Sequence, residues 1–198
     1  MYRYSTGTST TVQFINGATR NIMRYCKVVN GSTTSAGRAI QFSTSASNPT
    51  GNSYNLIESC IVDGGRYGIN LTGTSANPNA KNKIYGTEVF NNYFAGIWAQ
   101  ANTLGLEVDS CTFYHASAFA SNTTTYGMLF DSQTDSAILT RNTIYGLDVS
   151  GTSAIAGIII RTVSGSNYSR IVNNLISLTK SNNSTSVFGI DIGGTGIK

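Results

Sequence analysis

The sequence predicts an all-β protein that coils into a solenoid, and its composition and two recurring patterns predict this fold. Serine, threonine, asparagine and glycine make up 90 of the 198 residues, and all four weaken helix interiors. Hydrophobic residues amount to 40%, with 11 tyrosines and 8 phenylalanines, which is enough to build a core. We expect one domain over residues 1–198, as a segment of a larger protein.

The first pattern is apolar-x-x-(Cys/Asn/Thr)-x-apolar, which predicts a very short strand with the Cys, Asn or Thr position at a corner. Successive Cys, Asn or Thr positions lie 34, 27, 24, 31 and 32 residues apart. One turn of a β-solenoid takes about two dozen residues, so the excess is loop. The six copies are Met23–Val28, Ile57–Val62, Ile84–Val89, Val108–Phe113, Leu139–Ile144 and Ile171–Ile176.

The second pattern places two apolar residues on either side of one variable residue, and a glycine precedes its last five copies. Alternate residues of a strand point to opposite faces, so both apolar residues of a copy face the interior. Every position of the two resulting columns is apolar, which predicts a constant register despite loops of different length. The seven copies are Val12–Phe14, Ile40–Phe42, Ile69–Leu71, Ile97–Ala99, Met128–Phe130, Ile158–Ile160 and Ile190–Ile192.

These copies resemble the repeats of right-handed parallel β-helix proteins. The phrases that carry the resemblance are Asn142-Thr-Ile144, Asn174-Leu-Ile176, Gly68-Ile69-Asn-Leu71 and Gly189-Ile190-Asp-Ile192. The resemblance covers roughly residues 11–193 and implies a right-handed parallel β-helix of about six to seven turns. Pectate lyases, phage tailspikes and bacterial surface proteins share this scaffold. The resemblance also implies that Asn142 and Asn174 stack at a corner as a ladder of amides.

Three cysteines, Cys26, Cys60 and Cys111, stand at the position of the ladder asparagines. They are either small buried fillers with free thiols, or Cys26 and Cys60 form a disulfide between adjacent turns. The spacing of about 4.8 Å between turns exceeds the Cβ separation of a disulfide and favours free thiols. Because Thr87 interrupts the column and no histidine shares its register, the sequence predicts neither a metal site nor a cofactor.

The acidic residues Glu58 and Asp109 are the weak candidates for catalysis. The register places them in one outward column, two turns or about 9.6 Å apart, which is the spacing of an inverting acid pair. The alternative is an ordinary stacked ion pair, because Arg24 lies one turn from Glu58. The motifs of β-helix lyases and polygalacturonases do not occur in the sequence, which favours a protein that is not an enzyme.

Three further charged or titratable residues receive simple interpretations. Asp131 and Arg161 share an outward column on adjacent turns, which predicts a surface salt bridge. The single histidine, His115, begins a loop, and we expect it to be solvated.

Two outward columns are apolar where a solvated solenoid would be polar. One contains Phe90, Tyr114 and Tyr145, and the other contains Trp98, Leu129 and Ile159. Either long loops fold back and cover them, or they form an exposed platform. Stacked aromatic rings beside amides suit carbohydrate, so the candidate ligand-binding residues are Trp98, Asn70, Gln100, Phe90, Tyr114 and Tyr145.

Charge and hydropathy exclude two classes of partner. The net charge is +4 with no cluster of lysine or arginine, which argues against nucleic acid. No run approaches the ~18 apolar residues of a membrane-spanning helix. The low share of charged residues, 11%, with abundant asparagine, serine and threonine, favours an extracellular or cell-surface location.

The leading functional hypothesis is a non-catalytic secreted or cell-surface module of a bacterial protein, a stalk or adhesin segment that binds carbohydrate. One alternative is a polysaccharide lyase or glycoside hydrolase on the same scaffold. Another is an assembly protein that stacks end to end. The expected partners are a glycan, further β-helix turns of a longer chain, or end-stacked copies.

Overall fold

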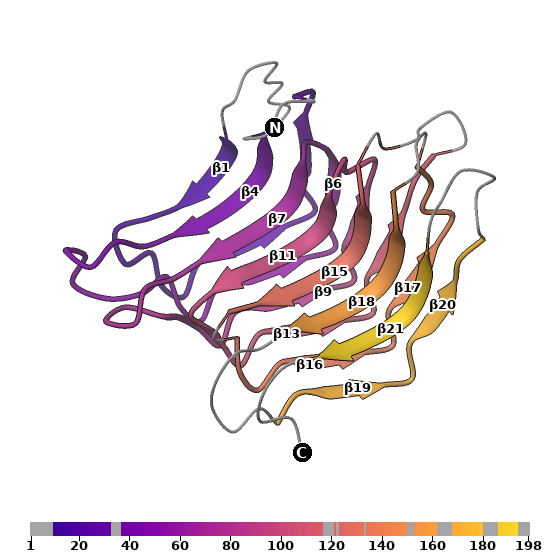
Figure 1. The fold of residues 1–198 in the computed structure, drawn as a ribbon. Coiled ribbons are helices and arrows are strands. Elements are labelled where there is room, and N and C mark those ends of the chain that lie inside the picture. The colour runs from indigo at the N-terminus through magenta and orange to yellow at the C-terminus, as the bar shows by residue number, and fades with distance from the viewer. Residues whose placement is uncertain are drawn as a thin grey trace.

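Three parallel sheets wind around one hydrophobic core and form a β-solenoid (Figure 1). The computed structural model describes residues 10–32, 37–116, 121, 123–132, 134–149, 153–161, 168–179 and 186–193. The secondary structure of this described part consists of strands. Among the described residues there is no helix long and apolar enough to cross a membrane.

Each turn contributes one strand to each of the three sheets, so strands distant in sequence lie side by side. Sheet A contains β1 (Thr10–Phe14), β4 (Arg38–Ser43), β7 (Tyr67–Thr72), β11 (Ala95–Ala101), β15 (Thr125–Asp131), β18 (Ile155–Arg161) and β21 (Val187–Gly193). Sheet B contains β2 (Ile22–Arg24), β5 (Leu56–Glu58), β9 (Lys83–Tyr85), β13 (Glu107–Asp109), β16 (Ile138–Thr140) and β19 (Arg170–Val172). Sheet C contains β3 (Lys27–Asn30), β6 (Ile61–Gly64), β10 (Glu88–Phe90), β14 (Thr112–Tyr114), β17 (Thr143–Tyr145) and β20 (Leu175–Ser177), and a small sheet pairs β8 (Asn79–Ala80) with β12 (Thr103–Leu104).

The predicted parallel β-helix is confirmed, and only the number of turns differs. The solenoid has about five turns, whereas the sequence predicted six to seven. The difference arises because each copy of a sequence pattern corresponds to one strand of a sheet, and a sheet contains one more strand than the steps between its strands. Six strands in sheet B or sheet C are separated by five steps of one turn each.

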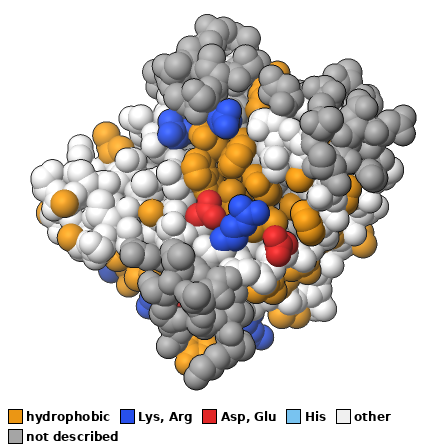
Figure 2. All heavy atoms as spheres, viewed as in Figure 1, with side chains coloured by type: hydrophobic (Ala, Val, Ile, Leu, Met, Phe, Trp, Pro, Cys, Tyr) orange, Lys and Arg blue, Asp and Glu red, His pale blue; other side chains and the backbone are white. Residues whose placement is uncertain are grey.

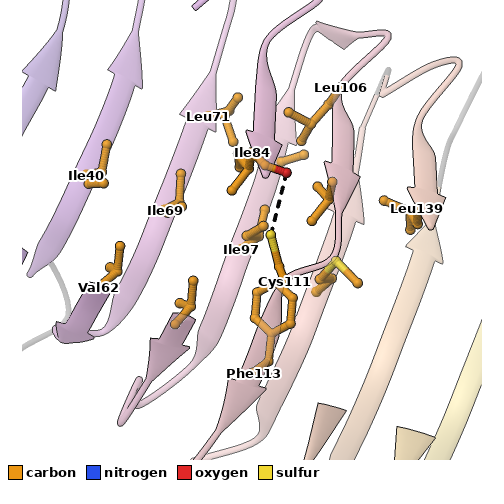
Figure 3. Packing of buried hydrophobic residues seen from close by; sticks show 14 of the residues in the cluster. Ile40, Val62, Ile69, Leu71, Ile84, Ile97, Leu106, Cys111, Phe113 and Leu139 are labelled. Atoms are coloured by element: carbon orange, nitrogen blue, oxygen red, sulfur yellow. Dashed lines mark hydrogen bonds between the residues drawn. The ribbon is translucent and has the colours of Figure 1, made fainter. Parts of the chain in front are cut away.

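The predicted interior columns of sheet A are confirmed in register. They run unbroken from Val12 and Phe14 in β1 to Ile190 and Ile192 in β21. Figure 3 shows interior side chains of this sheet, including Ile69 and Ile97, in the same core as residues of the other sheets. The register holds because a slip of one residue would turn the whole apolar set outward.

Each step from sheet B to sheet C makes a sharp corner at a single residue in the left-handed backbone region. Between sheets B and C these residues have φ from 50° to 56°, and they are Tyr25, Ser59, Gly86, Ser110, Arg141 and Asn173. The residue that follows belongs to the Cys/Asn/Thr column, so the predicted corner position of that column is confirmed. The predicted amide ladder is present too, since the backbone N–H and Nδ2 of Asn142 both donate to Asn174 Oδ1 at 2.9 Å.

A second asparagine ladder occupies the corner between sheets A and B, and the sequence patterns did not reveal it. The backbone N–H of Asn21 donates to Asn55 Oδ1 at 3.0 Å, and that of Asn55 donates to Asn82 Oδ1 at 2.9 Å. Both ladders satisfy backbone groups that the sharp corners would leave without partners.

The glycines before the sheet A motif are required by close packing. A Cβ at Gly96 would lie 2.6 Å from Phe113 Cδ1 of sheet C and 2.7 Å from the Gly127 carbonyl oxygen. Gly68, Gly127 and Gly157 meet comparable obstacles from the facing sheet and the next turn. The glycine column therefore sets how closely sheet A approaches sheet C.

The described C-terminal turn is much less buried than the middle of the solenoid. Its exposed apolar residues are Val172, Leu175, Phe188, Ile190 and Ile192, each at least 38% exposed. Members of the same columns in the middle turns, such as Ile97, are fully buried. Burial thus falls along the axis toward this end of the stack.

Candidate functional site

The two carboxylates proposed as an acid pair lie in the predicted column on the outer face of sheet B. Glu58 and Asp109 each pair with Tyr85, from the turns on either side of it. Glu58 forms an ion pair with Arg24, as the simpler interpretation predicted. Asp109 forms an ion pair with Arg141, which lies at a corner just after β16 and so outside the paired register.

Asp109 is held as an ionised carboxylate. Hydrogen bonds from the Arg141 guanidinium, and one from Thr140 Oγ1 at 2.9 Å, keep its pKa below the ordinary value. A general acid in a glycosidase needs the opposite shift, because it must carry a proton near neutral pH. The Asp109 environment therefore suits an ion pair on the surface of the sheet.

His115 is buried, which corrects the prediction of a solvated loop residue. Its Nδ1 accepts the backbone N–H of Asp148 at 2.9 Å, and its Nε2 lies 3.1 Å from the carbonyl oxygen of Asn92. Burial lowers the pKa of the imidazole to about 4, so it is neutral at pH 7. The sequence did not indicate this, because the partners are backbone groups of the neighbouring turns.

The cysteines Cys26, Cys60 and Cys111 are free, so the favoured alternative is confirmed. The Cys111 thiol donates to the Asp109 and Ile84 carbonyl oxygens at 3.4 and 3.5 Å, the latter drawn in Figure 3. Burial raises the pKa of this thiol to about 12. Within the described ranges, no three histidine, cysteine or acidic side chains gather into a group that would hold a metal ion.

The column Phe90, Tyr114 and Tyr145 forms a stacked ladder on the outer face of sheet C. Ring centroids are 4.9 and 5.2 Å apart, and the planes differ by 13° and 2°. Each face of the middle ring is therefore covered by a neighbour. The Tyr114 hydroxyl donates to Glu88 Oε1 at 2.7 Å, and burial with this carboxylate raises the pKa of the phenol. The middle ring of this ladder therefore presents its edge to solvent rather than a face.

The other predicted column lies on the outer face of sheet A and belongs to a larger cluster. Leu129 and Ile159 are buried, whereas Trp98 and Phe94 are partly exposed. The aliphatic members are therefore buried although they face outward, whereas the indole is partly exposed. We call this cluster the aromatic patch, which consists of Tyr67, Phe94, Ala95, Trp98, Tyr126, Leu129, Ala156 and Ile159.

The rings of the aromatic patch contact each other at an angle. Trp98 lies 4.8 Å from Tyr67 with planes 35° apart, and 5.5 Å from Phe94 with planes 57° apart. Phe94 also meets Tyr126 edge to face at 5.1 Å. Because no neighbouring ring in this set is parallel to the indole, Trp98 is not enclosed as Tyr114 is. Its Nε1–H donates to Asp131 Oδ2 at 2.9 Å, which fixes the ring.

Asp131 therefore has a different partner from the one predicted. It does pair in register with Arg161. Its carboxylate instead accepts the Trp98 indole N–H, and the ion pairs found among the described residues do not include Asp131 with Arg161. This hydrogen bond joins residues of two neighbouring outward columns, whereas strand register predicts contacts within one column.

Charged groups border the aromatic patch on two sides. Figure 2 shows hydrophobic side chains gathered on this face, with basic groups along one border and both acidic and basic groups toward the opposite one. On the first border the Arg66 guanidinium lies 5.1 Å from the Phe94 ring centre, and that of Arg38 lies 5.4 Å from Tyr67. Asp131 belongs to the second border, at the end of β15.

The two amides singled out in the sequence occupy different positions in this site. Asn70 faces outward as predicted, but it is fully buried. Its Oδ1 accepts Arg38 Nε at 3.0 Å, and its Nδ2 donates to the Trp98 carbonyl oxygen at 3.1 Å. Gln100 is partly exposed, and its Oε1 accepts the Thr72 hydroxyl at 3.2 Å. Asn70 therefore positions other residues, while Gln100 lies beside the indole at the surface.

Several members of the site were missed in the sequence. Tyr67, Ala95 and Tyr126 pair with each other one position before the glycine column, so aromatic residues before glycine were an available signal. Arg66 and Phe94 precede their strands and carry no repeat signal.

The fold and the aromatic patch define a parallel β-solenoid with one ring-lined face on its seven-stranded sheet. No protein-family model matches the chain, and no curated protein matches it. Among solved structures, it is similar to the Streptococcus pneumoniae surface protein and adhesin PfbA, with 13% identity and a TM-score of 0.46. The match covers 96% of this chain and 64% of that one, so the chain spans less than two thirds of that structure.

Proposed function

We propose that the protein is a secreted or cell-surface β-helix module that binds carbohydrate on the outer face of sheet A. The observation that carries the proposal is the Trp98 indole, which is partly exposed and anchored to Asp131 at 2.9 Å. A sugar ring has apolar faces and hydroxyl edges, so it suits an aromatic side chain flanked by polar groups. Gln100 and Asp131 supply such groups beside the indole.

Rigidity of the site supports binding. Trp98 lies in the middle of β11, whose neighbours β7 and β15 hold it from both sides. The surrounding rings and the Asp131 hydrogen bond restrain the indole further. A ligand therefore orders few side chains on binding, which lowers the entropic cost.

The environment of the sheet B carboxylates supports a binding module over the enzyme alternative. Glu58 and Asp109 are both members of ion pairs, and the pKa of Asp109 is lowered. These groups also lie on a different sheet from the aromatic patch, so they do not face a ligand bound at Trp98.

The test is retention on immobilised neutral and acidic polysaccharides, with soluble oligosaccharides followed in parallel. We expect the chain to be retained by at least one polysaccharide without releasing products. Trp98→Ala should weaken that retention at least tenfold, because it removes the stacking surface. Tyr145→Ala is the matched control, since it removes an exposed ring from the sheet C ladder and should leave retention unchanged.

Three results would overturn the proposal. Absence of retention would exclude a carbohydrate module, and equal losses from both alanine variants would exclude the patch as its site. Release of oligosaccharides would favour the lyase or hydrolase alternative and direct attention to Glu58 and Asp109.

A further inference from the structure

We propose that the aromatic patch selects acidic sugars, with the sugar carboxylate bound at Arg66 and the sugar ring on Trp98 and Phe94. This inference rests on the proposed carbohydrate function and adds the chemical class of the ligand. It is carried by the arrangement of charged groups around the patch rather than by the rings themselves.

Arg66 differs from the four basic side chains that form ion pairs among the described residues. The ion pairs of the described residues join Arg24 to Glu58, Lys27 to Asp63, Lys83 to Glu107 and Arg141 to Asp109. Arg66 takes part in none of them. Its Nε donates to the Tyr67 hydroxyl at 3.1 Å, and its guanidinium lies against the Phe94 ring.

These contacts hold the Arg66 guanidinium in place while leaving its terminal N–H groups without a hydrogen-bond acceptor in the described structure. A guanidinium has five N–H donors in a planar fork, and that fork matches a carboxylate. Packing on aromatic rings also removes part of its hydration, which strengthens its attraction for an anion. The side chain is therefore prepared for an external carboxylate.

A second cation, Arg38, lies on the same border of the aromatic patch as Arg66. The Arg38 guanidinium lies 5.4 Å from the Tyr67 ring centre, and that of Arg66 lies 5.7 Å from the same centre. Arg38 is kept there by the buried Asn70, which accepts its Nε–H at 3.0 Å. Two like charges on one ring repel each other, and a bound anion would offset that repulsion.

The opposite border sets the orientation of the ligand. Asp131 carries a negative charge next to Trp98, so it repels a second anionic group and accepts hydroxyl groups instead. An acidic sugar satisfies all three parts of the site, because it combines a carboxylate, an apolar ring face and hydroxyl donors. A neutral sugar would leave Arg66 without an acceptor.

The experiment compares a hyaluronan oligosaccharide with the same oligosaccharide after chemical reduction of its carboxyl groups. Binding of each is measured by titration calorimetry to the full chain at fixed salt. We expect the acidic form to bind at least tenfold more tightly. Arg66→Gln should reduce this preference to less than threefold, and Arg66→Lys should keep part of it, because a charge remains without the planar fork.

Lys83→Gln is the matched control, since it removes one positive charge from sheet B and should leave the preference unchanged. Thermal unfolding of each variant verifies that the fold persists, and Arg66→Lys serves if Arg66→Gln does not fold. Equal binding of both oligosaccharides, with loss of both in Trp98→Ala, would overturn the inference and keep the carbohydrate function. If Lys83→Gln lowered the preference for the acidic oligosaccharide as much as Arg66→Gln does, the preference would arise from the net charge of the protein. That result would also overturn the inference. Binding of neither oligosaccharide would contradict the inference, and the polysaccharide panel would then decide the carbohydrate function separately.

Discussion

His115 links three successive turns as a neutral imidazole, which makes the fold sensitive to acid. Burial lowers its pKa to about 4 from an ordinary value of 6.5, so between these values the unfolded chain binds a proton that the folded chain does not. Its contribution to stability is complete above pH 6.5 and is lost as the pH falls toward 4, by about 3 kcal/mol in all. Urea unfolding at pH 7.5, 5.5 and 4.5 measures this loss.

His115→Gln is the control for that titration. Glutamine keeps a polar side chain at the position but does not ionise, so stability should fall less between pH 7.5 and 4.5 than in the wild type. The variant should also be less stable at pH 7.5, because the Asp148 and Asn92 contacts are disturbed. Parallel pH dependences in the two proteins would show that His115 is not the group responsible.

At the scale of the element, we expect alanine substitution to have opposite effects on stability at two glycines of the sheet A column. Gly96→Ala places a Cβ against Phe113 and the Gly127 backbone, so we expect a loss of about 3 kcal/mol or more. At Gly189 a Cβ would meet nothing within 4 Å, so Gly189→Ala should be neutral or stabilise by about 0.5–1 kcal/mol.

Denaturant unfolding of both alanine variants tests the spacing between sheets A and C. The two substitutions are chemically identical and occupy the same column, so backbone entropy alone predicts the same effect for both. If Gly96→Ala were as stable as Gly189→Ala, the close approach of Phe113 to sheet A would be wrong.

The strands were predictable because their apolar periodicity repeats in every turn. Ile69 and Ile97 could be placed in one column from the sequence alone, since a one-residue error would expose both. The glycine column was visible in the sequence, but the structural reason that requires glycine there was not. The obstacle at Gly96 is Phe113, a residue of the facing sheet, and the strand pattern contains no information on contacts across the core.

The candidate site was predictable only where its residues follow the repeat. Trp98 and Gln100 were found because they occupy outward positions of a strand. Arg66 lies before its strand, so no register indicated it. Asn70 was placed on the correct face, but it is buried there and accepts a hydrogen bond from Arg38 of the neighbouring strand β4. Outward direction in a strand therefore does not establish exposure.

At the scale of the whole molecule, a solenoid gains stability from contacts between neighbouring turns, so its stability should vary along the axis. Strands β7, β11 and β15 have a paired strand on each side, whereas β21 pairs with β18 alone in the described structure. Ile97 is fully buried, but Ile192 in the last strand is 51% exposed. We therefore expect hydrogen exchange under native conditions to be slowest in the middle strands and fastest in β21.

A pair of substitutions measures the same gradient through side chains. Ile97→Ala leaves a cavity between two turns and should cost about 2–5 kcal/mol. Ile192→Ala removes a side chain that already contacts water over half its surface, so it should cost about 1 kcal/mol or less. Equal losses from the two variants would contradict the gradient of burial, and uniform protection along the axis would mean that the solenoid unfolds as one cooperative unit. Slow exchange in the middle strands together with fast exchange in β21 would show that turns separate from the end inward, which leaves the aromatic patch in the most stable part of the molecule.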